Sequence, residues 1–545
     1  MNKRVLILGG YGVFGARIAM GLARDSGLTV LVAGRDAGAA ARHCREFGGE
    51  AVVLDRDMPD LADQLSQLHP DLVIDAAGPF QIYGADPYRL ARIALQAGAH
   101  YLDLSDDAGF TDGIAALDTL ARARGLVALS GVSSVPALSS AVVTALIPGL
   151  SDIHLIDSVL LPGNRAPRGL SVIRAILAQV GKPLTLWRGG RAQPVPGWSG
   201  LTRVTLPGLG PRWASFIGAP DLSLFPARFN ARSVLFRAGL ELSVMHLSLG
   251  LLALPVRWGL VRDLTPLARP LRWLANGLHP FGSDRGGMLV RVIGLTPDGK
   301  AEQRDWTLIA GAGDGPHVPA LPARIVAGAV LGGRIAPGAR ACLAEFTLNH
   351  LAGVIGDLNI VTKTDVTPFP MLFPTVLGND FDRLPAPVRD LHRVIDQRDW
   401  RGRAQVTRGA GLLARLAAGI MRFPPAASDV PVTVSMTRKG EAEVWIRDFA
   451  GHRFRSYLRQ GRGGALTERF GPLRFRIGLA VKDGRLHYPV VSGTAFGLPI
   501  PRALLPQSNS LEAADDQGRA TFDVSLSHPV TGLIVRYQGW LVPSA

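Results

Sequence analysis

The sequence predicts an α/β protein that opens with a doubly wound parallel sheet, continues through an α+β segment and closes with a mostly β segment. Three observations predict this order. A buried-strand run, Val5 to Leu8, leads into a glycine turn and an amphipathic helix. Strands and helices then alternate regularly to residue 130. The C-terminal part alternates apolar and polar residues. We expect domains at 1–135, 136–370 and 371–545, the last boundary lying in the Pro-punctuated segment 362–385.

The glycine turn matches the pattern G-x-G-x-x-G at Gly10, Gly12 and Gly15. Between a strand and a helix, this pattern is typical of dinucleotide binding. We expect Gly10 to permit a tight turn, Gly12 to let backbone N–H groups approach a pyrophosphate, and Gly15 to allow close helix–strand packing. The helix N-terminus adds unpaired N–H donors and a positive dipole end. A plain strand–turn–helix is the alternative, because the chain contains 64 glycines.

The second expected strand, Thr29 to Ala33, ends where the residue that recognises the adenine ribose belongs, ~20 residues after the glycines. Ala33, Gly34 and Arg35 stand there in place of a carboxylate. A small residue leaves room for a 2′-phosphate, and the Arg35 guanidinium can pair with it, so the sequence predicts NADP in preference to NAD. The alternative is that Asp36 turns inward and Arg35 is a solvated loop charge.

The remaining elements of the first domain alternate as a parallel sheet requires. Strands are predicted at 51–54, 72–75, 100–104 and 126–129, and helices at 87–98 and 114–124. Because strand ends in such a sheet face the ligand crevice, we expect Asp55 near the adenine and residues 77–79 near the nicotinamide ribose. The expected cofactor-binding residues are Gly10, Tyr11, Gly12, Val13, Phe14, Gly15, Gly34, Arg35, Asp55, Ala77, Gly78 and Pro79.

Several motifs of this domain resemble, in the same order, those of the saccharopine dehydrogenase-like oxidoreductases. They are GGYGVFG at 9–15, AGR at 33–35, DAAGPF at 75–80 and GAHYLDLSDD at 98–107, followed by GVSSVPALS at 131–139. The resemblance implies an NAD(P)-binding Rossmann domain and hydride transfer. Asp106-Asp107 replaces a Gly-Glu pair common in that family, and Ala94-Leu95 stands where a cysteine is common. The family's amino-acid substrate is therefore not carried over to this chain.

The C-terminal part resembles an uncharacterised domain that is found behind saccharopine dehydrogenase-like domains in bacteria. The resemblance rests on WIRDF at 445–449, ERFGP at 468–472, GLPIP at 497–501 and YQGWL at 537–541. It supports the order of the domains and implies no chemistry. Alternating residues at 432–436 and 521–526, with a hairpin signal at 482–484, predict antiparallel strands. Such a sheet either cups an apolar ligand or covers the middle domain.

Composition excludes several classes of protein. A hydrophobic content of 47% with 19% charged residues argues against disorder. Two cysteines, Cys44 and Cys342, are too few for a disulfide framework. The first apolar run is expected to be a strand rather than a signal peptide. Together these observations predict a cytoplasmic protein. The net charge of +15 comes from scattered arginines without a nucleic-acid module, so we expect no nucleic-acid partner. An anionic membrane surface suits this charge better.

One stretch of the middle domain, 242–256, carries no formal charge. It is shorter than the ~20 residues that a membrane span needs. Length favours a buried core helix, in which His246 is a satisfied core histidine. There are two alternatives. Arg257, Trp258 and Arg262 follow the stretch, which suits an interfacial helix on a membrane, and the stretch could also form the wall of an apolar pocket.

The sequence assigns no catalytic residue. Its twelve histidines and two cysteines form no metal-binding spacing, so no metal is expected, and no nucleophile elbow is present. Asp103 and Asp106 end a strand near the expected nicotinamide, where each either orients a substrate or caps the next helix.

Taken with the resemblance, these features predict an NADP-dependent oxidoreductase that acts on an unidentified small molecule, apolar or lipid-like in character. We expect it in the cytoplasm, and keep open a peripheral contact with membrane lipid and a homodimer. The alternative is a non-catalytic protein, either a nucleotide sensor or a lipid-binding scaffold.

Overall fold

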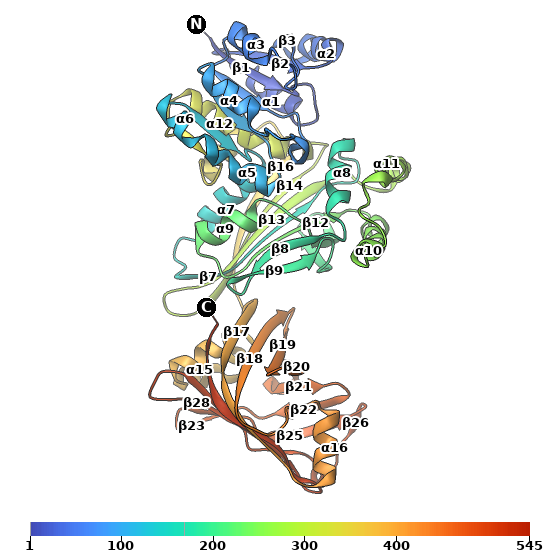
Figure 1. Ribbon diagram of the computed structural model, residues 1–545, viewed down its shortest axis with the longest axis vertical. Coiled ribbons are helices and arrows are strands. Elements are labelled where there is room, and N and C mark those ends of the chain that lie inside the picture. Colours follow the sequence, from blue (N-terminus) through green and yellow to red (C-terminus); the bar gives the residue numbers. More distant parts are fainter. Residues whose placement is uncertain (1, 168, 545) are drawn as a thin grey trace. The chain divides into compact units, whose positions relative to one another are not determined.

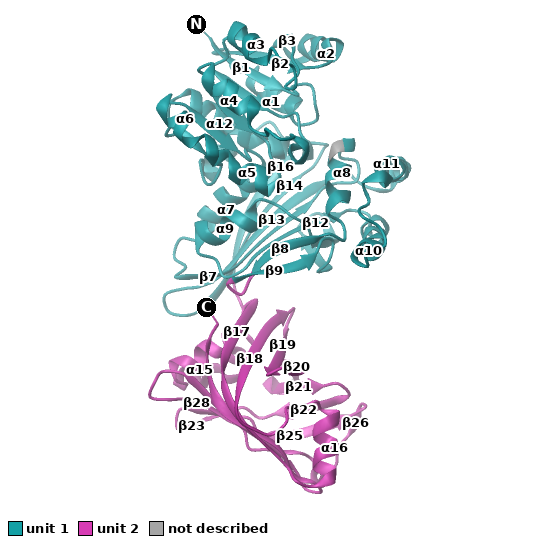
Figure 2. Cartoon of the chain, in the orientation of Figure 1, with its two compact units in different colours: residues 1–187, 191–367 teal, residues 188–190, 368–545 magenta. Residues whose placement is uncertain are grey.

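The computed structural model describes residues 2–167 and 169–544 (Figure 1). The chain forms two compact units (Figure 2). Unit 1 comprises residues 1–187 and 191–367, and unit 2 comprises residues 188–190 and 368–545. The boundary between residues 367 and 368 falls inside the Pro-punctuated segment 362–385.

Unit 1 begins with a seven-stranded parallel sheet in the order β15-β6-β5-β4-β1-β2-β3. Its strands are β1 (Lys3–Leu8), β2 (Leu28–Gly34), β3 (Glu50–Val53), β4 (Leu72–Asp75), β5 (His100–Asp103), β6 (Val127–Ser130) and β15 (Gly338–Ala341). The central strands are apolar on both faces, because helices cover each face. The strand order reverses between β1 and β4, which is where doubly wound sheets bind ligands. The predicted parallel α/β fold is confirmed.

The helices of this layer follow the predicted alternation with two differences. They are α1 (Gly15–Leu22), α2 (Ala37–Phe47), α3 (Leu61–Leu68), α4 (Arg89–Gln96), α5 (Ala108–Gly113), α6 (Asp118–Ala123) and α12 (Leu321–Leu331). The helix predicted at 114–124 is instead a 3-10 turn, η2 (Ile114–Leu117), followed by α6. Both β15 and α12 come from the segment expected in the middle domain, so the first two expected domains form one unit.

The second layer of unit 1 is a nine-stranded mixed sheet, in which β7 pairs parallel with β12 and antiparallel with β13. Its strands are β7 (Asp152–Leu161), β8 (Pro183–Arg188), β9 (Arg191–Pro196), β10 (Thr202–Leu206), β11 (Gly210–Phe216), β12 (Val234–Leu240), β13 (Gly286–Leu295), β14 (Ala301–Ala310) and β16 (Ile360–Pro368). Its helices are α7 (Ser139–Leu146), α8 (Leu170–Gln179), α9 (Asp221–Phe229), α10 (Ser243–Arg257), α11 (Ala268–Gly277) and α13 (Leu348–Val354). The predicted α+β character is confirmed.

Helix α10 covers the uncharged stretch 242–256 and lies on the surface. The favoured prediction of a buried core helix is wrong, since Val244 and Leu251 are 61% and 68% exposed. His246 is nevertheless a satisfied core histidine, as predicted. Its ring is buried, Nε2 lies 2.9 Å from the Ser215 hydroxyl, and Nδ1 accepts from the Leu240 N–H. Among the described residues, every helix is too short or too polar to span a bilayer.

The described residues of unit 2 form one continuous antiparallel sheet of fourteen strands with three α-helices, which confirms the predicted mostly β class. The strands are β17 (Gln397–Arg408), β18 (Ala427–Lys439), β19 (Ala442–Phe449), β20 (His452–Gln460), β21 (Leu466–Phe470), β22 (Leu473–Ile477), β23 (Ala480–Lys482), β24 (Arg485–His487), β25 (Val490–Ala495), β26 (Leu498–Pro499), β27 (Gln507–Ser508), β28 (Leu511–Ala514), β29 (Ala520–His528) and β30 (Gly532–Pro543). The helices are α14 (Leu372–Leu377), α15 (Ala386–Leu391) and α16 (Leu412–Ile420). The hairpin predicted at 482–484 joins β23 to β24, and Asp483 and Gly484 both have positive φ, as a tight primed turn requires.

Candidate functional site

The glycine turn joins β1 to α1 at the point where the strand order reverses. The residue with positive φ is Gly9, at 75°, so the tight turn depends on Gly9 and not on Gly10 as predicted. Gly10 is needed for another reason, because a Cβ there would lie 2.8 Å from the Ile7 carbonyl oxygen. A Cβ on Gly15 would lie 2.2 Å from the Gly9 carbonyl oxygen. Helix α1 therefore starts in direct backbone contact with the turn, as the sequence predicted.

The backbone N–H groups of the turn divide into two sets. Those of Gly9 and Gly10 donate to the Ala33 carbonyl at 2.9 and 3.1 Å, and that of Gly12 donates to the Gly9 carbonyl at 2.8 Å. The first two bonds fix the turn against β2, and the third closes the turn on itself. Among the described residues, the turn N–H groups without an acceptor are those of Tyr11, Val13 and Phe14. Unpaired donors immediately before a helix suit a pyrophosphate, so the turn fits the predicted cofactor.

The end of β2 is arranged around the ring of Tyr11. A Cβ on Gly34 would lie 2.5 Å from this ring, and the Tyr11 hydroxyl accepts from the Asp36 N–H at 2.9 Å. The Asp36 carboxylate accepts from the Ala39 N–H and caps α2, so it does not turn inward. Arg35 is exposed and makes no hydrogen bond or ion pair with the described residues. Its guanidinium is therefore available to a phosphate beside Gly34.

The loop after β4 is held by a buried polar pair. Asp75 is fully buried, and its carboxylate accepts from the Ala77 N–H at 3.0 Å and the Tyr83 hydroxyl at 2.9 Å. Burial raises the pKa of the Asp75 carboxyl. The Arg56 guanidinium lies 3.5 Å from the centre of the Tyr83 ring. These contacts fix the path of 76–83, and with it the expected cofactor residues Ala77, Gly78 and Pro79.

Asp55 follows β3, where we expected the adenine. Its carboxylate is half-buried and accepts from the Asp57 N–H at 3.1 Å. Its role toward the adenine remains a prediction.

The carboxylates at the end of β5 and in the loop after it have three different roles. One oxygen of Asp103 accepts from the N–H groups of Ser105 and Gly131 and from the Ser130 hydroxyl, and burial raises the pKa of this carboxyl to about 7. Asp103 thus ties β5 to β6. Asp107 caps α5 by accepting from the Phe110 N–H at 2.8 Å, a role that we had offered to Asp103 and Asp106.

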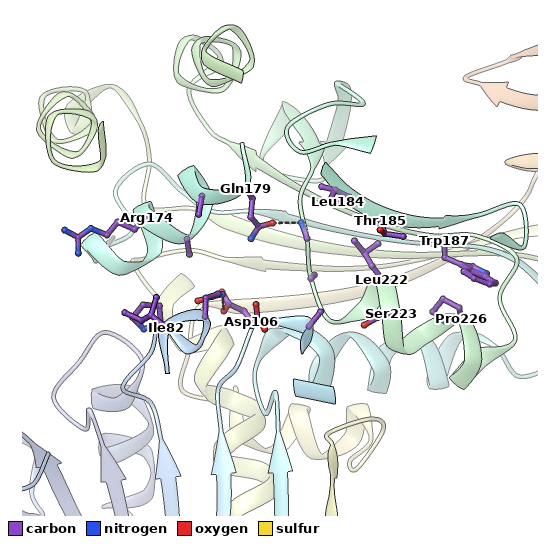
Figure 3. A pocket seen from close by; sticks show the side chains of 18 of the residues that line it. Ile82, Asp106, Arg174, Gln179, Leu184, Thr185, Trp187, Leu222, Ser223 and Pro226 are labelled. Carbon is purple, nitrogen blue, oxygen red and sulfur yellow. Dashed lines mark hydrogen bonds between the residues drawn. The ribbon is translucent and has the colours of Figure 1, made fainter. Parts of the chain in front are cut away.

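The third carboxylate, Asp106, lines a cleft of about 980 Å³. It accepts from the Gln81 side-chain amide at 3.1 Å. Figure 3 shows Asp106 and Ile82 facing helix α8 across the cleft. Pro79, the last of the expected cofactor residues, also lines it. The cleft therefore begins where the nicotinamide end of the cofactor is expected.

The far walls of the cleft come from the mixed sheet of unit 1. Helix α8, strand β8 and helix α9 supply mostly apolar side chains, and the Gln179 amide oxygen accepts from the Gly218 N–H at 2.7 Å (Figure 3). The principal side chains of these walls are Arg174, Ala178, Leu184, Thr185, Trp187, Leu222, Ser223 and Pro226. Sequence reasoning missed this wall, because its residues are of ordinary types and lie more than 150 positions from the glycine turn.

Comparisons with known proteins bear on both ends of the chain. Residues 5–129 match the family model described as the saccharopine dehydrogenase NADP binding domain. Residues 384–541 match a domain of unknown function, DUF4166. None of the curated proteins matches the chain.

Solved structures give weaker likenesses. Apo saccharopine dehydrogenase (L-Glu forming) from Saccharomyces cerevisiae is 16% identical with a TM-score of 0.49, covering 67% of this chain and 100% of the other. A probable dehydrogenase from Thermotoga maritima is 9% identical with a TM-score of 0.32, covering 64% and 97%. A 3-ketoreductase from Actinomadura kijaniata, in complex with NADP, is 14% identical with a TM-score of 0.28, covering 61% and 91%.

Proposed function

We propose that this chain transfers a hydride between NADP and a largely apolar small molecule held in the cleft beside Pro79. The chain is an NAD(P)-dependent oxidoreductase, and its residues 5–129 are a saccharopine dehydrogenase-type NADP-binding domain. The observation that supports this most is the continuity between the glycine turn, the loop 76–83 and the cleft within one compact unit.

The chain's own residues account for cofactor binding. The N–H groups of Val13 and Phe14 would hold the pyrophosphate, and Arg35 the 2′-phosphate. The loop at Ala77 to Pro79 would support the nicotinamide ribose. When bound, NADPH supplies the hydride.

The cleft indicates the chemical character of the substrate. Its walls are largely apolar, while polar groups such as Asp106, Arg174 and Ser223 stand at separate points. An apolar molecule with a single carbonyl, enoyl or imine group fits this lining. In its protonated form Asp106 would give a proton to the oxygen or nitrogen of a carbonyl or imine as the adjacent carbon receives the hydride, or to the α-carbon of an enoyl group as the β-carbon receives it, so charge balances in the step.

The test is NADPH consumption by the full-length protein with apolar carbonyl, enoyl and imine compounds. Ala178→Trp places an indole in the cleft from the exposed side of α8, and should abolish turnover while NADPH affinity stays unchanged. Val172→Trp, on the same helix but outside the cleft, is the matched control and should retain turnover. Equal turnover in the two variants would place the substrate elsewhere.

A second proposal concerns where the substrate is acquired. Helices α10 and α11 and their connection expose an apolar surface that includes Leu251 (68% exposed), Trp258 (68%) and Trp273 (79%). Residues 242–281 contain four exposed arginines and one acidic residue, Asp263. An exposed apolar patch with tryptophans and positive charge suits the surface of an anionic bilayer. This α10–α11 surface would bring the enzyme to a lipid-soluble substrate.

Flotation with vesicles of equimolar phosphatidylcholine and phosphatidylglycerol tests the membrane contact. The double variant Trp258→Ser, Trp273→Ser should bind the vesicles more than tenfold more weakly, because two indoles leave the interface. Val361→Ser removes a comparably exposed apolar side chain from β16 and should leave binding unchanged. Wild-type protein that stays unbound at low salt would overturn the proposal.

A further inference from the structure

Unit 2 encloses a cavity of about 330 Å³ that the NADP-binding domain does not explain. Strands β18, β19, β22, β29 and β30 form its floor, with α16 at its edge. Most of its lining is apolar and well buried, as at Val434, Phe449 and Leu541. A cavity of this size lies at the lower end of the ~300–1,000 Å³ typical of small-molecule sites.

A small polar group interrupts this apolar lining. The Arg447 guanidinium donates to the Ser456 hydroxyl at 2.9 Å and lies 3.6 Å from the Glu468 carboxylate. The Glu468 atom nearest to Arg447 is Oε1, which is buried and, apart from this ion pair, makes no hydrogen bond with the described residues. Because an unsatisfied buried acceptor is costly, this oxygen is suited to a donor on a ligand.

A second carboxylate in the lining, Glu512, is already satisfied. It accepts from the Tyr488 hydroxyl at 2.8 Å and pairs with the His392 ring at 2.5 Å. Among the described residues of the lining, Arg447 carries the only guanidinium, and it faces Glu468. An anionic head group would therefore meet two carboxylates and no free cation, whereas a hydroxyl group can donate to Glu468.

We propose that unit 2 binds a neutral amphiphile in this cavity, an apolar chain whose hydroxyl group donates to Glu468. The apolar chain lies along the strands of the floor, and the hydroxyl group is held at Glu468 and Arg447. This binding is non-covalent and independent of the hydride-transfer site, which lies in unit 1.

The helix at the cavity's edge indicates how such a ligand enters. Ala417 and Met421 of the α16 region line the cavity, while Leu412 and Ile420 on its outer side are 82% and 73% exposed. Residues 409–427 contain two arginines, Arg415 and Arg422, and no acidic residue. An apolar outer face with only positive charge suits a lipid bilayer, from which the amphiphile would pass beneath α16.

The test uses the full-length protein and displacement of the neutral fluorophore N-phenyl-1-naphthylamine. Dodecan-1-ol should displace it at least tenfold more effectively than dodecane or dodecanoic acid. Dodecane has no hydroxyl group that could donate to Glu468, and dodecanoic acid is anionic at neutral pH. Equal displacement by the alcohol and the alkane would overturn the assignment of the polar end. No displacement by any of the three would overturn the cavity as a site.

Two sets of variants sharpen the test. Glu468→Gln removes the anionic acceptor and leaves Arg447 without a carboxylate, so the preference should reverse from dodecan-1-ol to dodecanoic acid. Ala417→Trp fills the cavity from α16 and should abolish displacement, while Leu413→Trp, on the exposed side of the same helix, should not. Unchanged selectivity in the folded Glu468→Gln protein, or equal behaviour of the two tryptophan variants, would contradict the proposal.

Entry past α16 is tested by transfer of dodecan-1-ol from vesicles of equimolar phosphatidylcholine and phosphatidylglycerol. Leu412→Ser with Ile420→Ser should slow the transfer at least tenfold without changing affinity in free solution. NADPH titration of the same proteins should be unaffected, which separates failure of this proposal from failure of hydride transfer. Transfer at the wild-type rate would overturn the route.

Discussion

Replacing Gly15 by alanine should disable cofactor binding through a backbone clash. The new Cβ would lie 2.2 Å from the Gly9 carbonyl oxygen and 3.0 Å from the Gly10 Cα, whereas ordinary contacts begin at 3.4 Å. The turn or the first turn of α1 must therefore move by more than 1 Å. Overpacking of this kind typically costs about 1–3 kcal/mol of stability.

The same movement displaces the N–H donors of Val13 and Phe14. Hydrogen bonds to a charged group each contribute about 1.5–3 kcal/mol, so loss of two should weaken NADPH binding about a hundredfold or more. NADPH fluorescence titration measures the affinity, and urea unfolding measures the stability. Gly250→Ala in α10 is the control, because nothing lies within 4 Å of its Cβ. A folded Gly15→Ala protein with wild-type NADPH affinity would refute the reasoning.

Two further predictions concern the buried carboxylates that support the site. Asp103→Asn keeps the oxygen that accepts three hydrogen bonds. Because burial raises the folded-state pKa of Asp103 to about 7, above its usual value, the wild-type protein should lose stability as pH rises from about 4 to about 7. The variant lacks this loss. The free energy of unfolding of the variant, measured in urea relative to the wild type, should therefore rise over that pH window by at most about 4 kcal/mol. A pH-independent difference between the two proteins would contradict the assignment. Tyr83→Phe removes the donor to fully buried Asp75 and should cost about 1–3 kcal/mol in the same assay; an unchanged midpoint would mean that this bond does not hold the loop.

The nucleotide-binding part was predictable because its signals are local. A buried strand, a glycine turn and a helix occur within twenty residues, and Gly15 has the packing role that the pattern predicts. The assignment of the tight turn to Gly10 instead of Gly9 was wrong, since the pattern does not determine which residue of a Gly-Gly pair turns the chain. Asp36 was ambiguous for a similar reason, because a side chain after a strand can either bind a ribose or cap a helix.

The cleft and the return of β15 to the first sheet were not predictable, because both depend on contacts between distant segments. Leu222 and Trp187 carry no motif, and their place in the same cleft as Asp106 follows from the packing of the mixed sheet. Helix α10 shows the limit of a length argument. A run of fifteen uncharged residues suits a core, but this helix lies at the surface, with Val244, Leu247 and Leu251 exposed.

The central claim is that Arg35 and the glycine turn select NADP, and parallel titrations of full-length protein with NADPH and NADH test it most directly. Wild-type protein should bind NADPH more tightly than NADH. Arg35→Ala should weaken NADPH binding about tenfold to a hundredfold and leave NADH binding unchanged, because only NADPH carries the 2′-phosphate. Absence of binding by either nucleotide, or an Arg35→Ala protein with unchanged NADPH affinity, would contradict the account.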